Sequence, residues 1–379
     1  MARIEKERLQ VILSKAGLFP RTALVAMSGG ADSTFAAWAM KTLGIETVGI
    51  HFRMGDFSDE DGPERRCCSL EDARDADRMA LKLGIPMYHY NVEQSFHDRV
   101  IRPFAEAYAK GITPNPCICC NPEIKWKYLL KKARELGIDA IVTGHHARTV
   151  KAGNEEATSL FTGLEDKKEQ SYFLARLLPG QLERALLPAG WFKKDDIRDT
   201  LSHAGLDVAR KAESQDICFV GEQGYVKIVE DLLEAPPGPG PVLDVEGNVI
   251  GEHQGIHRYT VGQRKGLSVS SPEPLYVIEI LPEKNAVVAG HDDMVFSETA
   301  MAEDFVWTGK APSPDEVVAV KIRYKSPPLP ARIAVEAGNR VRIEFSGPAR
   351  AVTPGQAAVV YRDEAVIGSG FLIRRGDPT

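Results

Sequence analysis

Long apolar runs are missing from this chain of 379 residues. None approaches the roughly 18 residues that a membrane-spanning helix needs, which excludes a transmembrane segment. The N-terminus, Met1 to Arg8, is charged and lacks the apolar core of a secretory signal. We therefore expect a cytoplasmic protein without a membrane partner.

An overall excess of basic charge is missing too. The net charge is −6, with 43% hydrophobic and 26% charged residues, as in an ordinary soluble globular protein. No global field therefore attracts a nucleic acid. Residues 317–350 differ, because seven Lys or Arg and two Glu give that segment a charge of +5. A local patch of this kind is enough for phosphate contacts, and a solvated face is the alternative.

Cysteines are few and fall in three places: Cys67, Cys68, Cys117, Cys119, Cys120 and Cys218. Such clustering argues against a disulfide scaffold and indicates metal or redox chemistry. Each cysteine taken alone could also be a small buried apolar residue.

The first half of the chain alternates strands with helices. We expect strands at 23–27, 47–52, 87–92 and 140–143, and helices near 31–43, 69–83, 94–110 and 122–136. Ser69 and Asp72 form a possible capping box at the second helix. This alternation predicts an α/β fold, a doubly wound parallel sheet whose ligands bind at the carboxyl ends of the strands.

The pattern changes after about residue 210. Residues 236–241 form a stiff, helix-free Pro-Gly connection inside a β-rich region. Short alternating strands follow, with expected members at 317–324, 332–335, 340–345 and 356–361, and they indicate a sandwich or barrel. We predict a nucleotide-binding and catalytic domain over 1–212, a central β-rich domain over 213–288 and a C-terminal β-barrel over 289–379.

The clearest motif is Ser28-Gly-Gly-Ala-Asp-Ser33, between the first strand and its helix. Two glycines let the backbone approach a phosphate, and the helix N-terminus attracts the anion. Asp32 could hold Mg²⁺ beside it. The loop lacks the Gly-Lys-Ser/Thr of a Walker A motif, which disfavours a kinase or GTPase. An unspecialised tight turn is the alternative.

A second motif surrounds three cysteines, from Thr113 to Lys125. We expect Asn121 to cap a helix that begins at Pro122, which would put Cys120 just before a helix N-terminus. That position, with Lys125 nearby, would favour the thiolate form of Cys120.

These motifs together carry a family resemblance. The loop at Ser28–Ser33 resembles that of the PP-loop ATPases, which bind the pyrophosphate of ATP while adenylating a substrate. With the cysteine loop and Cys218, the chain is similar throughout to the bacterial tRNA-specific 2-thiouridylases. The further matching segments, in order, are 143–148, 169–174, 258–267, 323–324 and 352–356.

The resemblance implies roles for individual residues. Asp32 and Cys120 would be catalytic, with Cys120 the nucleophile, and Cys218 would carry a persulfide. The ATP-binding residues would be Ala26, Met27, Ser28, Gly29, Gly30, Ala31, Asp32, Ser33, Phe52 and Gly144. The residues that contact tRNA would be Asn115, Pro116, Cys117, His145, Lys168, Glu169, Gln170, Arg323, Tyr324 and Gln356. Arg264 and Lys265 could meet the RNA backbone or simply lie on the surface.

The implied reaction uses ATP with Mg²⁺ to adenylate the 2-oxo group of a wobble uridine in tRNA, after which sulfur displaces AMP. A sulfur-donor protein or sulfide is the further partner. The rivals are another PP-loop adenylating ligase and a non-catalytic iron–sulfur or RNA-binding protein.

The sequence departs from the common family pattern at Cys117 and Glu169, where many relatives carry Asp. Cys117, Cys120 and Cys218 together offer three thiolates for a [4Fe–4S] cluster with one open iron. We hypothesise such a cluster. A persulfide relay with Cys117 as a spectator, and a zinc site, compete with it. Cys119 stays unassigned, and packing is the default for Cys67 and Cys68.

Overall fold

The computed structural model describes residues 4–55, 70–151, 157–206, 208, 217–220 and 224–374. The chain divides into two compact units. The first comprises Met1–Arg99, Cys117–Glu222 and Glu364–Val366, and the second comprises Val100–Pro116, Gln223–Asp363 and Ile367–Thr379. The domain boundaries expected at 212/213 and 288/289 stay predictions.

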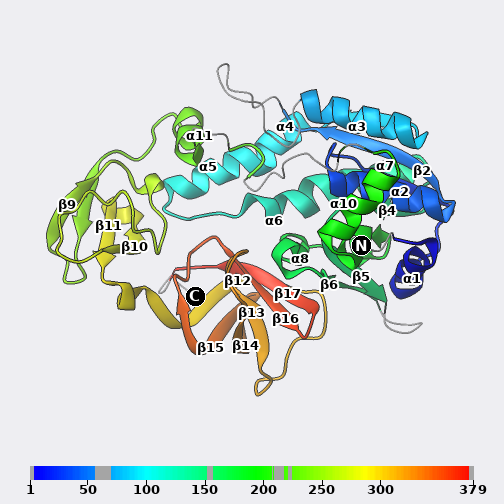
Figure 1. Ribbon diagram of the computed structural model, residues 1–379. Coiled ribbons are helices and arrows are strands. Elements are labelled where there is room, and N and C mark those ends of the chain that lie inside the picture. Colours follow the sequence, from blue (N-terminus) through cyan, green and yellow to red (C-terminus); the bar gives the residue numbers. More distant parts are fainter. Residues whose placement is uncertain are drawn as a thin grey trace. The chain divides into compact units, whose positions relative to one another are not determined.

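A five-stranded parallel sheet forms the centre of the first unit, in the order β3-β2-β1-β4-β7 (Figure 1). Its strands are β1 (Thr22–Ala26), β2 (Glu46–Arg53), β3 (Met87–Asn91), β4 (Ala140–Val142) and β7 (Ala185–Leu186). The four strands expected here are confirmed within one residue or two. The strand order reverses between β1 and β4, and that reversal is where α/β sheets of this kind bind ligands.

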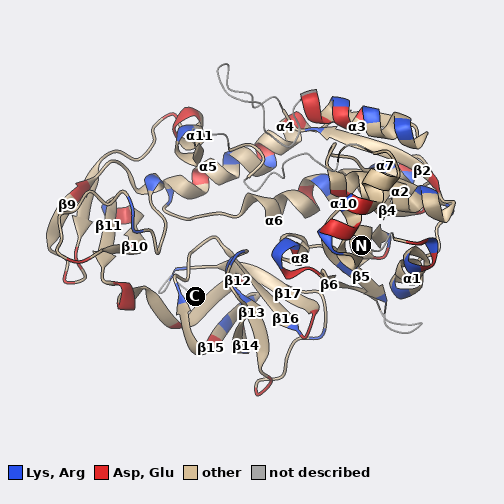
Figure 2. Cartoon of the chain, viewed as in Figure 1, with Lys and Arg blue, Asp and Glu red and all other residues tan. Residues whose placement is uncertain are grey.

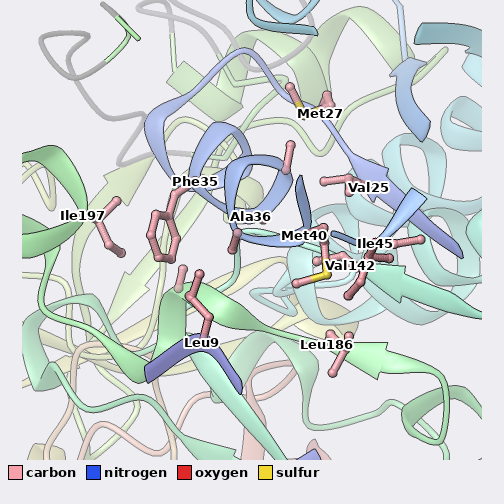
Figure 3. Close-up of a cluster of buried hydrophobic side chains, with 14 of the residues drawn as sticks. Leu9, Val25, Met27, Phe35, Ala36, Met40, Ile45, Val142, Leu186 and Ile197 are labelled. Atoms are coloured by element: carbon pink, nitrogen blue, oxygen red, sulfur yellow. The ribbon is translucent and has the colours of Figure 1, made fainter. Parts of the chain in front are cut away.

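Apolar side chains anchor helices to both faces of this sheet, as its buried strands require. Val25 of β1 and Val142 of β4 lie in one cluster with Phe35 and Met40 of helix α2 (Figure 3). Leu9 of α1 completes that side of the core. Helix α7 packs against β1 and β4. The doubly wound α/β fold is therefore confirmed. The helices around the sheet are α1 (Lys6–Ala16), α2 (Ala31–Leu43), α3 (Leu70–Leu83), α4 (Glu93–Phe96), α6 (Pro116–Cys120), α7 (Lys127–Glu135), α8 (Ser171–Leu174), α9 (Pro179–Leu182) and α10 (Lys194–His203).

Two expected helices contain a π-helical segment. The region expected as 94–110 consists of α4, π-helical His97–Ile101 and α5 (Arg102–Ala109). The region expected from residue 122 begins earlier, at Pro116, and passes through π-helical Asn121–Trp126 into α7. A proline inside a helix lacks an N–H and crowds the preceding turn, so we attribute the second π-helical segment to Pro122.

The first unit also contains an antiparallel hairpin that the sequence did not predict. Strands β5 (Ala147–Lys151) and β6 (Thr158–Thr162) pair from Ala147↔Thr162 to Lys151↔Thr158. The hairpin follows directly on the loop after β4, and so it fixes the end of that loop.

The second unit contains helix α5 and a mixed four-stranded sheet in the order β10-β11-β8-β9. Its strands are β8 (Gly240–Leu243), β9 (Val249–His253), β10 (Tyr276–Leu281) and β11 (Ala286–Gly290). Helix α11 (Gly224–Leu232) packs on α5, and Tyr108 stacks on Tyr225 with ring centroids 4.3 Å apart. The Pro-Gly segment 236–241 is helix-free as expected and leads into β8.

The rest of the second unit is a closed six-stranded antiparallel barrel, which confirms the barrel expectation (Figure 1). Its strands are β12 (Phe296–Trp307), β13 (Val318–Lys321), β14 (Leu329–Glu336), β15 (Arg340–Arg350), β16 (Ala357–Arg362) and β17 (Ala365–Leu372). Pairing of β12 with β17 closes it. A Cβ atom on Gly368 would lie 2.6 Å from the Trp307 ring, so the glycine makes room for that side chain. No helix among the described residues is long and apolar enough to cross a membrane.

Candidate active site

The phosphate loop leaves β1 and turns tightly into α2. Gly29 has φ +76°, and a Cβ there would lie 2.6 Å from the carbonyl oxygen of Asp72. The Ser28 N–H donates to Ser33 Oγ at 3.2 Å, and Ser33 Oγ–H donates to the Gly30 carbonyl at 3.0 Å. The N-cap residue of α2 is Gly30, which has no side chain to cap the helix. The first N–H groups of this helix can therefore bind an anion, as expected of a phosphate site.

Gly144 lies against this loop at the carboxyl end of β4. A Cβ on Gly144 would lie 2.5 Å from both the Asp32 carbonyl carbon and the Ser33 nitrogen. Only glycine permits so close an approach of two backbones. The structure thus brings together Gly144 and Ser28–Ser33, at the point where the strand order reverses.

Asp32 is held by two buried side chains. Lys194 Nζ lies 2.6 Å, and His146 Nε2 lies 3.0 Å, from the same oxygen, Asp32 Oδ1. Lys194 and His146 are each 3% exposed, whereas the Asp32 side chain is 29% exposed. Burial raises the pKa of the Asp32 carboxyl, but hydrogen bonding and charge from His146 and Lys194 outweigh it, so the pKa lies below its ordinary value. Asp32 is ionised at neutral pH.

Sequence reasoning missed both partners of Asp32. His146 lies in a quoted motif in which only His145 received a role. Lys194 occupies the first turn of α10, where the helix dipole disfavours a cation. A buried lysine in the first turn of a helix needs an anionic partner from elsewhere in the chain. This unfavourable position of Lys194 is the signal that could have indicated a partner such as Asp32.

The segment Glu165–Gln170 contacts both partners of Asp32. Glu165 Oε2 accepts the Lys194 N–H at 2.6 Å. Gln170 Oε1 accepts the His146 N–H at 2.9 Å, and the Gln170 N–H donates to the His146 carbonyl at 2.8 Å. Two of the predicted tRNA-contact residues, Lys168 and Glu169, lie inside this segment, and Gln170 ends it.

The other predicted nucleotide residues lie at the same edge of the sheet. Ala26 ends β1, and the Met27 N–H donates to the Ile50 carbonyl of β2. Phe52, near the end of β2, is buried among aromatic rings, with Tyr90 at 6.3 Å and Tyr128 at 6.5 Å between centroids. These positions suit a nucleotide pocket at the carboxyl ends of the strands.

The expectation that Cys120 precedes a helix N-terminus is wrong. Cys120 ends α6 with helical φ −60° and ψ −41°, and the helix continues beyond it. Asn121 is no cap; its Nδ2 donates to the carbonyls of Cys117 and Phe173, at 3.1 and 2.9 Å. Cys120 is 5% exposed. Burial raises the pKa of its thiol to about 12, although Lys125 opposes this. The thiolate is therefore not favoured here.

Cys117, Cys120 and Cys218 do not form a metal site in this conformation. Among the described residues, no three His, Cys, Asp or Glu side chains are grouped so that they could hold a metal ion. Phe219, next to Cys218, packs edge-on against Phe96. The arrangement does not fit a three-cysteine cluster. Cys67, Cys68 and Ser69 lie outside the described residues.

His145 is a neutral side chain next to the phosphate loop. Its Nδ1 lies 2.7 Å from Thr143 Oγ1. Withdrawal of the ring from water, followed by the nearby charge of Lys125, lowers the pKa of His145 to about 3. It can therefore bind a polar group by hydrogen bonding but brings no positive charge to an RNA phosphate.

Two of the remaining predicted tRNA residues, Arg323 and Gln356, donate hydrogen bonds to other residues of the second unit. Arg323 donates through one nitrogen to the carbonyls of Val261 and Ala351 and to the hydroxyl of Thr353. Gln356 Nε2 donates to the Thr113 carbonyl at 2.9 Å. Tyr324 follows Arg323, Asn115 precedes α6, and Pro116 begins that helix.

Two acidic residues outside the basic segment 317–350 offset part of its +5 charge, and the two glutamates inside the segment, which that charge already counts, pair with Arg342. Arg340 pairs with Glu303 at 3.3 Å, and Arg350 pairs with Asp292 at 2.7 Å. Arg342 lies 3.4 Å from Glu344 and 3.6 Å from Glu336. Figure 2 accordingly shows acidic and basic positions interspersed over this unit. The +5 charge of the segment therefore overstates its attraction for RNA.

Comparison with known proteins gives matches along nearly the whole chain. Models described as "tRNA methyl transferase HUP domain", "tRNA methyl transferase PRC-barrel domain" and "Aminomethyltransferase beta-barrel domain" match residues 21–222, 228–291 and 297–372. A protein of Geobacter metallireducens named tRNA-specific 2-thiouridylase MnmA is 42% identical over 92% of this chain and 96% of its own. Proteins of the same name from Geotalea uraniireducens and Carboxydothermus hydrogenoformans are also 42% identical, over 93% and 94% of this chain and 95% and 98% of their own.

Proposed function

The chain belongs to the family of tRNA-specific 2-thiouridylases, and from this premise we propose that it converts a uridine of tRNA to 2-thiouridine at the expense of ATP. The observation that carries the proposal is the phosphate loop at the reversal of strand order, with the ionised Asp32 beside it. This is the arrangement that an adenylating enzyme needs.

We propose that the site first activates the uridine. The 2-oxo oxygen attacks the α-phosphorus of ATP, the bond to pyrophosphate breaks, and an O-adenylated base forms. The N–H groups at the start of α2 and the Ser28 hydroxyl bind the pyrophosphate. Mg²⁺, when bound, offsets phosphate charge. Asp32 Oδ2 would hold it, because the two donors described above both take Oδ1.

We propose that sulfur transfer then uses two cysteines. A persulfide on Cys218 attacks C2 of the base through its terminal sulfur, and AMP leaves. Cys120 thiolate attacks the inner sulfur of Cys218, so that the S–S bond breaks, C2 keeps the sulfur and a Cys120–Cys218 disulfide forms. An external dithiol then returns two electrons to the disulfide. A sulfur-donor protein recharges Cys218.

This scheme requires a rearrangement, because Cys120 is a buried thiol in the structure. Exposure to solvent would remove the burial that raises this pKa and bring it toward the ordinary range. We expect tRNA binding to supply that change. The predicted tRNA contacts, the two domain boundaries and a cytoplasmic location belong to the same proposal.

The [4Fe–4S] cluster remains the alternative source of sulfur, and we derive no step through it. Iron and acid-labile sulfide in protein purified without oxygen decide between the two routes. About four of each per chain, lost in Cys117→Ala and kept in Cys119→Ala, would favour the cluster. Neither element, even after attempted reconstitution, would leave the Cys218 persulfide.

The proposed function is tested by supplying tRNA, ATP, Mg²⁺ and a persulfide donor. We expect tRNA-dependent pyrophosphate release and a base in which sulfur replaces oxygen. Asp32→Ala should abolish both the pyrophosphate release and the modified base. Its tRNA affinity, measured without nucleotide, should stay unchanged, because the proposed role of Asp32 is in the ATP site. No pyrophosphate release from the wild type with tRNA present, or a methylated base instead, would contradict the proposal.

A further inference from the structure

Two hydrogen-bonded routes connect Asp32 to a single short segment of the chain. One runs from Gln170 through the His146 backbone and ring to Asp32 Oδ1. The other runs from Glu165 through the Lys194 backbone and side chain to the same oxygen. Both routes therefore begin in Glu165–Gln170 and end on one atom.

The links in both routes are short and buried. The distances from segment to backbone are 2.9 Å at His146 and 2.6 Å at Lys194, and those from side chain to carboxylate are 3.0 and 2.6 Å. His146 and Lys194 are each 3% exposed, so neither side chain has room to turn away without repacking. A displacement of the segment would therefore move both donors of Asp32.

We propose that Lys194 and His146 are positioning residues that couple the segment Glu165–Gln170 to the nucleotide site. This inference rests on the proposed function, in which Lys168, Glu169 and Gln170 of the segment contact tRNA. When tRNA fixes the segment, both donors are fixed, and Asp32 Oδ2 points into the site before Mg·ATP arrives. Linkage makes the effect mutual, so bound nucleotide must favour tRNA to the same degree.

The test measures a coupling factor rather than activity. tRNA affinity is measured with and without a non-hydrolysable ATP analogue plus Mg²⁺, and analogue affinity with and without tRNA. In the wild type we expect the same factor from both directions, on the order of 5- to 150-fold. A merely structural role for Lys194 would weaken one affinity or both without changing this ratio.

The main variant is Lys194→Met, with Lys193→Met as the matched control. Lys193 is the exposed neighbour, so its substitution has the same chemistry outside both routes. We expect the factor to fall but stay above one in Lys194→Met, because the His146 route remains, to recover in part in Lys194→Arg, which keeps the charge, and to stay unchanged in Lys193→Met. An unchanged factor in folded Lys194→Met would overturn the proposal.

Removing Lys194 leaves Asp32 with one donor fewer, and the variant could fail to fold. Glu165→Ala then carries the test, because Glu165 is neither in the nucleotide site nor among the predicted tRNA contacts. It breaks one route at its start, and we expect a factor reduced but above one. A factor equal to that of the wild type would contradict the inference.

Failure of this inference differs from failure of the proposed function. Wild-type protein that releases pyrophosphate with tRNA, yet shows a coupling factor of one, would refute only the coupling. Wild-type protein that binds neither ligand, or binds both without turnover, would refute the function itself.

Discussion

The phosphate loop and Cys120 of helix α6 both lie in the first unit, but their reactive groups differ in exposure and in ionisation. Asp32 is ionised, and its side chain is 29% exposed next to uncapped helical N–H groups. Cys120 is 5% exposed, and the pKa of its thiol is raised to about 12. The adenylation half of the site is thus assembled without ligands, whereas the sulfur half needs a change of conformation. Such an order would keep a reactive sulfur covered until its target base is present.

The largest effect that would sharpen this contrast is the alkylation of Cys120. A thiol with a pKa of about 12 carries roughly a thousandfold less thiolate at neutral pH than an ordinary one. We expect Cys120 to react with iodoacetamide at least that much more slowly than glutathione. Because the folded pKa lies above the ordinary value, the rate should keep rising with pH beyond the point where that of glutathione levels off. Peptide mass spectrometry measures the rate.

The same experiment can also contradict the contrast between the ionised Asp32 and the buried Cys120 thiol. Added tRNA and ATP analogue should raise the alkylation rate of Cys120 if sulfur chemistry requires its exposure. Reaction of the ligand-free protein as fast as glutathione at neutral pH would show that Cys120 is as accessible and as readily ionised as an ordinary thiol, which would contradict the contrast.

A smaller effect is expected at the contact between Gly144 and the phosphate loop. An added Cβ must push the loop away, since it would lie 2.5 Å from backbone atoms of Asp32 and Ser33. Misplacement by about 1 Å can cost on the order of a hundredfold. We expect Gly144→Ala to weaken binding of an ATP analogue, measured by calorimetry, and to slow tRNA-dependent pyrophosphate release by about that factor.

Gly180→Ala is the matched control for that variant. Apart from its chain neighbours and the backbone of its own helix, no atom of the described residues lies within 4 Å of the Cβ it would add. Its nucleotide affinity should equal that of the wild type. Equal affinities for Gly144→Ala and the wild type would mean that the close approach does not shape the site.

The smallest effect concerns the basic segment of the barrel. Arg340 and Arg342 are paired with glutamates, so releasing their counterions should contribute little to tRNA affinity. We expect their Ala variants to leave the slope of log affinity against log salt nearly unchanged. Lys168→Ala should reduce that slope by about one, if Lys168 contacts a phosphate. A full unit lost at Arg340 would restore the basic-patch interpretation.

The sequence predicted the nucleotide half well because its signals are local. A buried strand, two glycines and a helix define the phosphate loop, and Ala31–Leu43 is the helix that was expected. The partners of Asp32, His146 and Lys194, are 114 and 162 positions away along the chain. A local sequence pattern does not extend over such separations, so it could not predict these contacts.

The cysteine helix shows why the other half could not be predicted. Pro116 and Pro122 both suit a first helical position, and the choice between them decides the electrostatics of Cys120. The helix begins at Pro116, and Asn121 finds partners at Cys117 and Phe173 instead of capping. Tertiary contacts at Phe173 therefore reversed an expectation that local propensity supported.

The contrast between the two halves is tested most directly by pyrophosphate release from Cys120→Ser, with Cys119→Ser as its control. Single-turnover reactions with tRNA, ATP, Mg²⁺ and a persulfide donor would be followed for pyrophosphate and for 2-thiouridine. If adenylation is assembled independently of sulfur transfer, Cys120→Ser releases pyrophosphate at the wild-type rate and forms no 2-thiouridine, while Cys119→Ser does both. Loss of pyrophosphate release in Cys120→Ser would contradict this account.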